Sequence, residues 1–180
     1  MIWTPQSHQH CTLENFDWKG REKLKSIVDA LLENKRKGIV LFGPPGVGKT
    51  HLFVGMFRKL VEKGMLLGSE VIYIQFSELV GEVLNGYELG VTLEKLVSRM
   101  MVKYLIVDDV RPVAGERWKH ILKVLIENAY THEIRFCFST NADTENELWS
   151  YLLLEDYYIS RILYMCSLVH VTGSDRRQVG

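Results

Sequence analysis

One run of the sequence, Gly43-Pro44-Pro45-Gly46-Val47-Gly48-Lys49-Thr50, has the pattern of a phosphate-binding loop. Glycines let successive backbone N–H groups curl around phosphate oxygens, and a helix that starts at the loop directs its positive dipole end toward them. The Lys49 ammonium can then reach the β- and γ-phosphates, and the Thr50 hydroxyl can bind Mg²⁺. An apolar segment precedes the loop and a segment of helical periodicity follows it, as such a site requires. The run therefore predicts a site for a nucleoside triphosphate and Mg²⁺.

Two further segments place polar side chains directly after apolar strands. Asp108 and Asp109 follow residues 104–107, and the strand at 134–138 ends in Ser139-Thr140-Asn141. A carboxylate at the end of a buried strand is where a Mg²⁺-associated acid is needed, so we assign Asp108 to the metal, through water. Asp109 would orient or deprotonate the water that attacks the γ-phosphate. The neutral amide of Asn141 can hydrogen-bond both that water and the γ-phosphate.

Two arginines are further candidates. Arg161 lies in an apolar helical segment, and Arg177 lies near the end of the chain. Guanidinium groups stabilise charge on a transferring phosphoryl group. Spacing alone leaves an ordinary surface role equally open for both residues.

The order of the elements predicts how these residues are held. Near-continuous apolar strands are expected at 39–42, 71–74, 104–107, 134–138 and 167–171. Amphipathic helices are expected at 21–34, from the loop to Gly64, from Ser77, from Thr92, at 118–129 and at 144–154. This alternation predicts an α/β fold with a mostly parallel five-stranded sheet flanked by helices. Phosphate sites in such folds lie at the carboxyl ends of the strands.

The composition limits the class of protein. The chain of 180 residues suits one domain, and its 22 basic and 22 acidic residues argue against a strong stand-alone DNA-binding protein. Cys11, Cys137 and Cys166 have no metal-ligand spacing and suit a reducing compartment. His8 and His10 are expected to be solvated rather than metal ligands. Because there is neither a spanning apolar segment nor a signal-peptide core, a cytoplasmic protein is expected.

Taken together, these residues resemble the AAA+ ATPases, and within them the DnaC-type helicase-loader branch related to DnaA-type initiators and IstB-type transposition helpers. The resemblance extends from Thr12 to Arg177. Its more specific features are the extended loop motif Gly48-Lys49-Thr50-His51-Leu52 and the pair Asp108-Asp109, where Asp-Glu is more widespread.

The resemblance implies roles for individual residues. ATP and Mg²⁺ would be the ligands, with residues 43–51, His51 included, around the phosphates and residues 13–16 at the adenine. Asn141 matches the family's sensor 1. Arg161 matches its arginine finger, which acts in trans on the ATP of a neighbour in a homo-oligomer, and Arg177 matches sensor 2, which acts in cis. Hydrolysis of ATP by this chain would be slow until the oligomer forms.

The resemblance also implies partners and boundaries. A replicative helicase and single-stranded DNA would be the partners, and the DNA contact is expected between residues 77 and 101, with Lys95, Arg99 and Lys103 as candidates. Residues 1–11 would be a flexible lead-in and 12–180 the AAA+ domain, without a separate helical lid domain. Two alternatives stay open: an IstB-type transposition helper and a small-molecule P-loop kinase, which would need an acceptor-binding lid.

Overall fold

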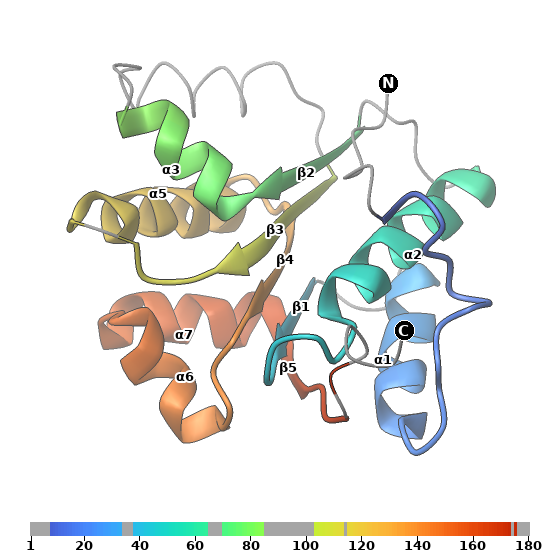
Figure 1. The fold of residues 1–180 in the computed structure, drawn as a ribbon. Coiled ribbons are helices and arrows are strands. Elements are labelled where there is room, and N and C mark those ends of the chain that lie inside the picture. The colour runs from blue at the N-terminus through green and yellow to red at the C-terminus, as the bar shows by residue number, and fades with distance from the viewer. Residues whose placement is uncertain are drawn as a thin grey trace.

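A sheet of five parallel strands runs through the centre of the protein, as Figure 1 shows. The computed structural model describes residues 8–33, 38–64, 70–84, 103–113, 115–173 and 175. The order of the strands across the sheet is β2-β3-β4-β1-β5, so β4 lies between the strand that leads into the phosphate loop and the strand that carries the two aspartates. The strands are β1 Gly38–Phe42, β2 Val71–Gln75, β3 Tyr104–Val110, β4 Arg135–Thr140 and β5 Cys166–His170.

Helices cover both faces of the sheet. The helices α1 and α2 lie on one face, and α3, α5, α6 and α7 lie on the other (Figure 1). Side chains of β1 alternate between these two layers: Ile39 and Leu41 pack with α1 and α2, whereas Val40 and Phe42 pack with the opposite layer. A strand covered in this way is apolar at successive positions, which is why the five strands were predictable. The described helices are α1 Glu22–Leu32, α2 Lys49–Glu62, α3 Phe76–Leu84, α5 Arg117–Thr131, α6 Glu145–Leu152 and α7 Asp156–Met165.

The predicted fold class is confirmed, and most helix signals lie where they were expected. Gly64 ends α2 with a φ of 66°, and its N–H donates to the carbonyl of Val61. The Thr144 hydroxyl accepts a hydrogen bond from the N–H of Glu147, so it caps α6 as the sequence predicts. Within the described residues no separate helical lid domain is present.

Several predicted boundaries were wrong; β4, for example, is Arg135–Thr140 and not 134–138. The helix predicted from Ser77 begins at Phe76, so Ser77 lies inside its first turn and is not the N-cap. The predicted helix 144–154 ends at Leu152, because Leu153 turns into the left-handed region with a φ of 50°. The strand predicted at 104–107 continues through both aspartates to Val110. The helix predicted from Thr92 lies outside the described residues.

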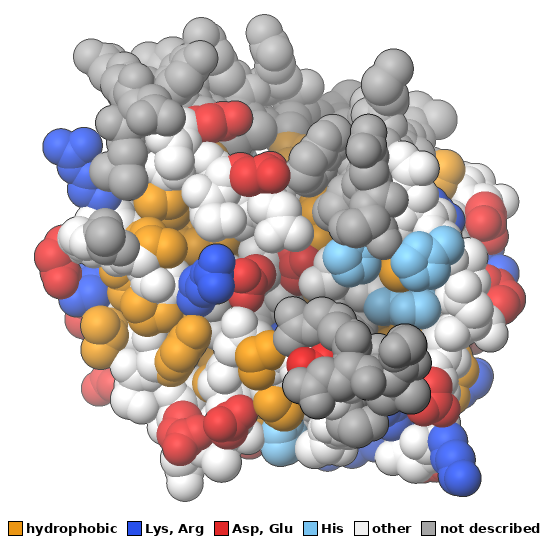
Figure 2. Space-filling model, in the orientation of Figure 1, with side chains coloured by type: hydrophobic (Ala, Val, Ile, Leu, Met, Phe, Trp, Pro, Cys, Tyr) orange, Lys and Arg blue, Asp and Glu red, His pale blue; other side chains and the backbone are white. Residues whose placement is uncertain are grey.

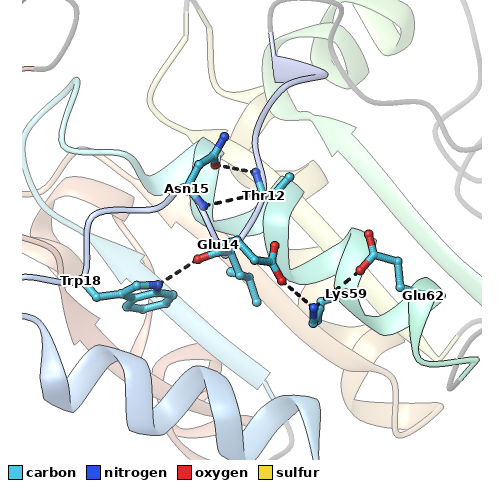
Figure 3. A network of polar contacts seen from close by, with 7 residues as sticks. Thr12, Glu14, Asn15, Trp18, Lys59 and Glu62 are labelled. Atoms are coloured by element: carbon cyan, nitrogen blue, oxygen red, sulfur yellow. Dashed lines mark hydrogen bonds and ion pairs between the residues drawn. The ribbon is translucent and has the colours of Figure 1, made fainter.

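The segment that precedes α1 is held along α2, as Figure 3 shows. Thr12 and Asn15 exchange two hydrogen bonds between the backbone N–H of one and the side chain of the other. Lys59 of α2 forms an ion pair with Glu14, and the indole N–H of Trp18 donates to the carbonyl of Leu13. The side chain of His51, in the first turn of α2, also contacts Thr12 and Asn15, so the segment reaches the end of α2 that follows the phosphate loop.

The predicted lead-in at 1–11 is described only from residue 8. Cys11 is 1% exposed, so the end of this segment already packs against the domain. No helix among the described residues is long and apolar enough to cross a membrane.

Candidate nucleotide-binding site

The loop between β1 and α2 has the backbone of a phosphate-binding nest. Gly43, Gly46 and Gly48 have φ angles of 142°, 79° and 100°, values that L side chains rarely adopt. A Cβ added at Gly43 would lie 2.2 Å from the carbonyl oxygen of Val171, so this position also lacks room for a side chain. Because α2 begins at Lys49, the N–H groups of its first turn face the loop, as anion binding requires.

A pocket of about 500 Å³ opens over this loop. Its lining includes Lys49 and Thr50, the two side chains that the loop motif predicts for phosphate and Mg²⁺. The Lys49 ammonium donates to the carbonyls of Gly43 and Pro44, at 2.6 and 2.8 Å, which keeps it against the loop backbone. The volume lies in the range of pockets that bind nucleotide-sized ligands. The glycine cradle, the cation and the hydroxyl all fit ATP with Mg²⁺.

The Asp108 carboxylate is fully buried at the base of this pocket. Tyr73 donates its hydroxyl to Asp108 Oδ2 at 2.5 Å, Gln75 donates to the same oxygen at 3.3 Å, and Ser139 donates to Oδ1. Burial, and then the charge of Asp108, raise the pKa of Tyr73, so the phenol stays protonated and remains a donor. Hydrogen bonds from neutral partners offset the cost of burying the carboxylate and fix its orientation.

Asp109 is turned out of the strand into the pocket by a bulge. The pairing of β3 with β4 shifts between Val107 and Val110, and Asp109 has a φ of 56°. Such a conformation is uncommon for residues other than glycine and is tolerated best by Asn and Asp. The backbone N–H of Asp109 donates to the Ser139 hydroxyl at 2.9 Å, which holds the bulge against β4.

Both oxygens of the Asp109 carboxylate have partners. Asn141 donates its amide to Oδ1 at 2.8 Å, and Arg111 Nε lies 3.3 Å from Oδ2. Asp108 and Asp109, predicted at the end of one strand, and Asn141, predicted at the end of another, thus line one pocket with the phosphate loop. They meet because β3 and β4 are adjacent and parallel, so their carboxyl ends lie at the same edge.

Histidines form another wall of the same pocket. His8, His10, Cys11 and His51 line it, and Figure 2 shows histidine side chains gathered on this face. His10 is exposed, as expected, whereas His8 is half-buried, because the anchored N-terminal segment brings both residues to the pocket. Burial lowers the pKa of His8, which favours its neutral form. Among the described residues no group of three His, Cys, Asp or Glu side chains is arranged to hold a metal ion.

The side chain of His51 faces the N-terminal segment. Its Nε2 lies 3.0 Å from the carbonyl of Thr12 and 2.8 Å from Asn15 Oδ1, so this nitrogen donates to both. A contact of His51 with phosphate would therefore come from its backbone N–H, in the first turn of α2. Phe16 is buried beneath Gly48 and His51 and is not part of the pocket lining; the N-terminal segment contributes His8, His10 and Cys11 instead.

Arg21 connects the loop with the segment that follows β5. Its guanidinium donates to the carbonyl of Val47 at 3.2 Å and to that of Thr172 at 2.7 Å, and it lies over the Phe16 ring. The segment after β5 also approaches the loop at Asp175. A Cβ added at Gly46 would lie 1.9 Å from Asp175 Oδ1. Arg177, Lys95 and Arg99 lie outside the described residues, and Lys103 pairs with Glu70.

Arg161 lies away from this pocket. It is on α7, packed on α5, where it forms an ion pair with Glu127. Its guanidinium carbon lies 3.9 Å from the centre of the Tyr157 ring and 4.5 Å from that of Tyr130. Within one chain Arg161 therefore does not reach the site, and a role in hydrolysis would have to be in trans.

Sequence patterns did not single out several residues of the site. Tyr73 lies within an apolar strand and Gln75 at its end, so neither residue stood out in the sequence. A polar residue near the end of the strand that neighbours the Asp108 strand could have indicated a contact with Asp108. Ser139 was recognised only as the end of a strand. Arg111 lies in an unpatterned segment and Arg21 at the start of a predicted helix, and only the fold brings them to the pocket and the loop.

The family model and the individual relatives that match this chain agree with one another. The family model described as "IstB-like ATP binding protein" matches residues 5–179. A Pseudomonas aeruginosa protein of insertion sequence IS21 is 21% identical over 173 residues, which are 92% of this chain and 64% of that protein. The replicative helicase loader DnaI of Bacillus subtilis is 24% identical over 159 residues, 79% of this chain and 48% of that protein. The chain thus spans between about half and two thirds of the length of these two relatives.

The fold is also similar to solved structures. A crystal structure of DnaI superimposes with a TM-score of 0.78 and 20% identity, covering 97% of this chain and 95% of that chain. At this level of identity the likeness establishes the fold, and the site has to be argued from its own residues.

Proposed function

Because this chain belongs to the IstB-like ATP-binding protein family, an AAA+ branch shared with DnaC and DnaA, we propose that it is an ATP-hydrolysing switch protein of the helicase-loader type. The observation that carries the proposal is the convergence of Lys49, Asp108, Asp109 and Asn141 on one pocket over the glycine loop. A pocket with only a phosphate-binding role would not need a second carboxylate and an amide at its far wall.

Each side chain has a distinct task in the proposed reaction. Lys49 and the N–H groups of the loop bind the β- and γ-phosphates, and Thr50 with Asp108 holds Mg²⁺, which supplies charge neutralisation at the phosphates. Asp109 accepts a hydrogen bond from the attacking water, and Asn141 orients both that carboxylate and the γ-phosphate. The bulge at Asp109 sets its carboxylate in the pocket, which compensates for a side chain one methylene shorter than Glu.

A further positive charge, which stabilises the transferring phosphoryl group, is supplied by a neighbouring subunit. We assign Arg161 to the ATP of the next copy of this chain in a homo-oligomer, because α7 carries it away from its own pocket. An arginine of this kind contributes about 10³-fold or more to turnover. A single subunit should therefore hydrolyse ATP slowly.

A mixing experiment tests both parts of the proposal. Lys49→Ala should abolish binding of ATP, and Arg161→Ala should retain binding but lose most of the turnover. Neither variant alone should be active, but mixing them should restore hydrolysis, because Lys49→Ala subunits provide Arg161 to intact nucleotide sites. Arg117→Ala, at an exposed residue outside the pocket lining, is the matched control.

The outcomes separate the hypotheses. ATP affinity that is unchanged in Lys49→Ala would refute the phosphate-loop assignment. Turnover per subunit that does not depend on protein concentration would mean a self-contained site, and would favour a monomeric enzyme of the kinase type over the proposed switch.

The relatives support two candidate protein partners. We propose a replicative helicase as the protein partner, since DnaI is a replicative helicase loader and shares this fold. The IS21 relative favours a second candidate, a transposition helper that acts on a transposase. Stimulation of hydrolysis by one of these two proteins and not by the other distinguishes them.

Single-stranded DNA is the proposed nucleic-acid ligand, with Lys95, Arg99 and Lys103 as its candidate contacts. Its affinity should fall with salt, with a slope of about −0.7 per phosphate contact in a double-logarithmic plot. A flat line would exclude direct binding of single-stranded DNA.

A further inference from the structure

Arg111 is a second cation at the described part of the pocket. It follows β3 directly and lines the pocket together with Lys49, Thr50 and Asn141. Apart from histidines, Lys49 and Arg111 are the two cationic side chains among the described lining residues, which also include Asp108 and Asp109. The Lys49 ammonium is hydrogen-bonded to the loop backbone. Arg111 is therefore the cation on the side of the pocket where Asp109 and Asn141 lie.

The contact between Arg111 and Asp109 conflicts with a role of Asp109 as the base. The Arg111 guanidinium at Oδ2 neutralises the negative charge that would draw the attacking water to Asp109, and Asn141 already donates to Oδ1, so the paired carboxylate is a weaker acceptor than a free one. Asn141 and the Ser139 contact to the Asp109 backbone are part of the sheet edge and fix the position of the carboxylate. Arg111 is the partner that is able to leave, because its side chain is 50% exposed and comes from the segment after the strand.

We propose that Arg111 reads the γ-phosphate: its guanidinium pairs with Asp109 when no γ-phosphate is present and moves to the γ-phosphate of bound ATP. This inference rests on the proposed function of the pocket. A phosphate group presents more negative charge and more acceptor oxygens than one carboxylate, and a guanidinium can bind it through two parallel N–H groups. The transfer removes the counter-charge from Oδ2 of Asp109, so the carboxylate is a stronger acceptor for the attacking water when a triphosphate is bound. ADP has no γ-phosphate and leaves the ion pair in place.

Equilibrium binding to the full chain tests this assignment. With Mg²⁺ present, Arg111→Ala should weaken binding of a non-hydrolysable ATP analogue by about 10-fold or more, the usual value of a hydrogen bond between charged groups, while the affinity for ADP stays unchanged. Arg117→Ala, an exposed arginine outside the pocket lining, should change neither affinity. An equal loss of affinity for both nucleotides would overturn the proposal, since it would mean that Arg111 only supports the shape of the pocket.

A double-mutant cycle gives a second and independent test. Asp109→Asn removes the charge that competes for Arg111, so it should tighten binding of the ATP analogue in the wild-type background but not in the Arg111→Ala background. Equal effects of Asp109→Asn in both backgrounds would refute the exchange of partners. Lys49→Ala separates this inference from the proposed function: if it abolishes binding of both nucleotides while Arg111→Ala changes neither, the phosphate site is retained and the role of Arg111 is wrong.

Discussion

Glu127→Gln should lower the protein concentration at which ATP hydrolysis becomes half-maximal. In the single chain the Arg161 guanidinium is held by the Glu127 carboxylate and lies against the rings of Tyr157 and Tyr130. An arginine that acts on the ATP of a neighbour has to leave this carboxylate first. The free energy of the ion pair therefore opposes formation of the active interface.

The size of the effect follows from the exposure of the pair. Hydrogen bonds between charged groups contribute about 1.5–3 kcal/mol when shielded, and exposed ion pairs contribute about 1 kcal/mol or less. The side chains of Arg161 and Glu127 are 18% and 35% exposed, which places the pair between these limits, at about 1–2 kcal/mol. Glutamine keeps the length of the side chain and leaves both ring contacts in place. The half-maximal concentration should therefore fall by roughly 5- to 30-fold, since 1.4 kcal/mol corresponds to a factor of 10.

The assay is turnover per subunit measured over a wide range of protein concentrations. Glu155→Gln is the matched control, because Glu155, at the N-cap of α7, forms an ion pair with Lys123 of α5, whereas Arg161 pairs with Glu127. The curve of Glu127→Gln should shift to lower concentration and reach the plateau of the wild type, whereas the control should not shift. A half-maximal concentration that stays the same or rises in Glu127→Gln would refute the reasoning, because Glu127 would then support Arg161 in its active position.

Three further predictions concern other parts of the molecule. Tyr73→Phe removes a donor to buried Asp108, so the Mg²⁺ concentration for half-maximal hydrolysis should rise up to about 10-fold; an unchanged Mg²⁺ requirement would contradict the metal role of Asp108. Thr144→Ala removes the side-chain cap of α6 and should lower the free energy of unfolding in a denaturant titration by about 1 kcal/mol, without changing nucleotide affinity. Burial raises the pKa of the Cys137 thiol to about 12, so it should stay protonated at pH 8 and resist iodoacetamide until the protein unfolds; rapid alkylation of the native protein would be inconsistent with its position in the sheet.

The parts of the fold that could be predicted depend on local chemistry. The apolar runs of the five strands, the glycines of the loop and the Thr144–Glu147 pair are short patterns, and each has few structural alternatives. The positions of Asp108, Asp109 and Asn141 were predictable for the same reason, since each follows a recognisable strand. Their expected meeting at one edge needed only the assumption of a parallel sheet.

The contacts that tune the site could not be predicted, because they depend on which strands are neighbours. Ser139 bridges Asp108 and the Asp109 backbone only because β4 pairs with β3, and no sequence pattern specifies that pairing. The bulge at Asp109 adds a residue to a strand whose apolar pattern continues normally up to Val107. Arg21 contacts Val47 and Thr172 across 26 and 151 residues of sequence, a separation at which local signals carry no information.

The two guanidinium groups at the centre of the proposed mechanism share one arrangement. Arg111 is paired with Asp109 and Arg161 is paired with Glu127, so in the single chain each cation is neutralised by a carboxylate of its own subunit. Neither pair is deeply buried, so each can be exchanged at modest cost when a phosphate with more negative charge is presented. The γ-phosphate of bound ATP would take Arg111 from within the subunit, and the same group on a neighbouring subunit would take Arg161. Hydrolysis would then require both the triphosphate and the interface, which is the behaviour expected of a switch that has to stay loaded until it is assembled on its partner.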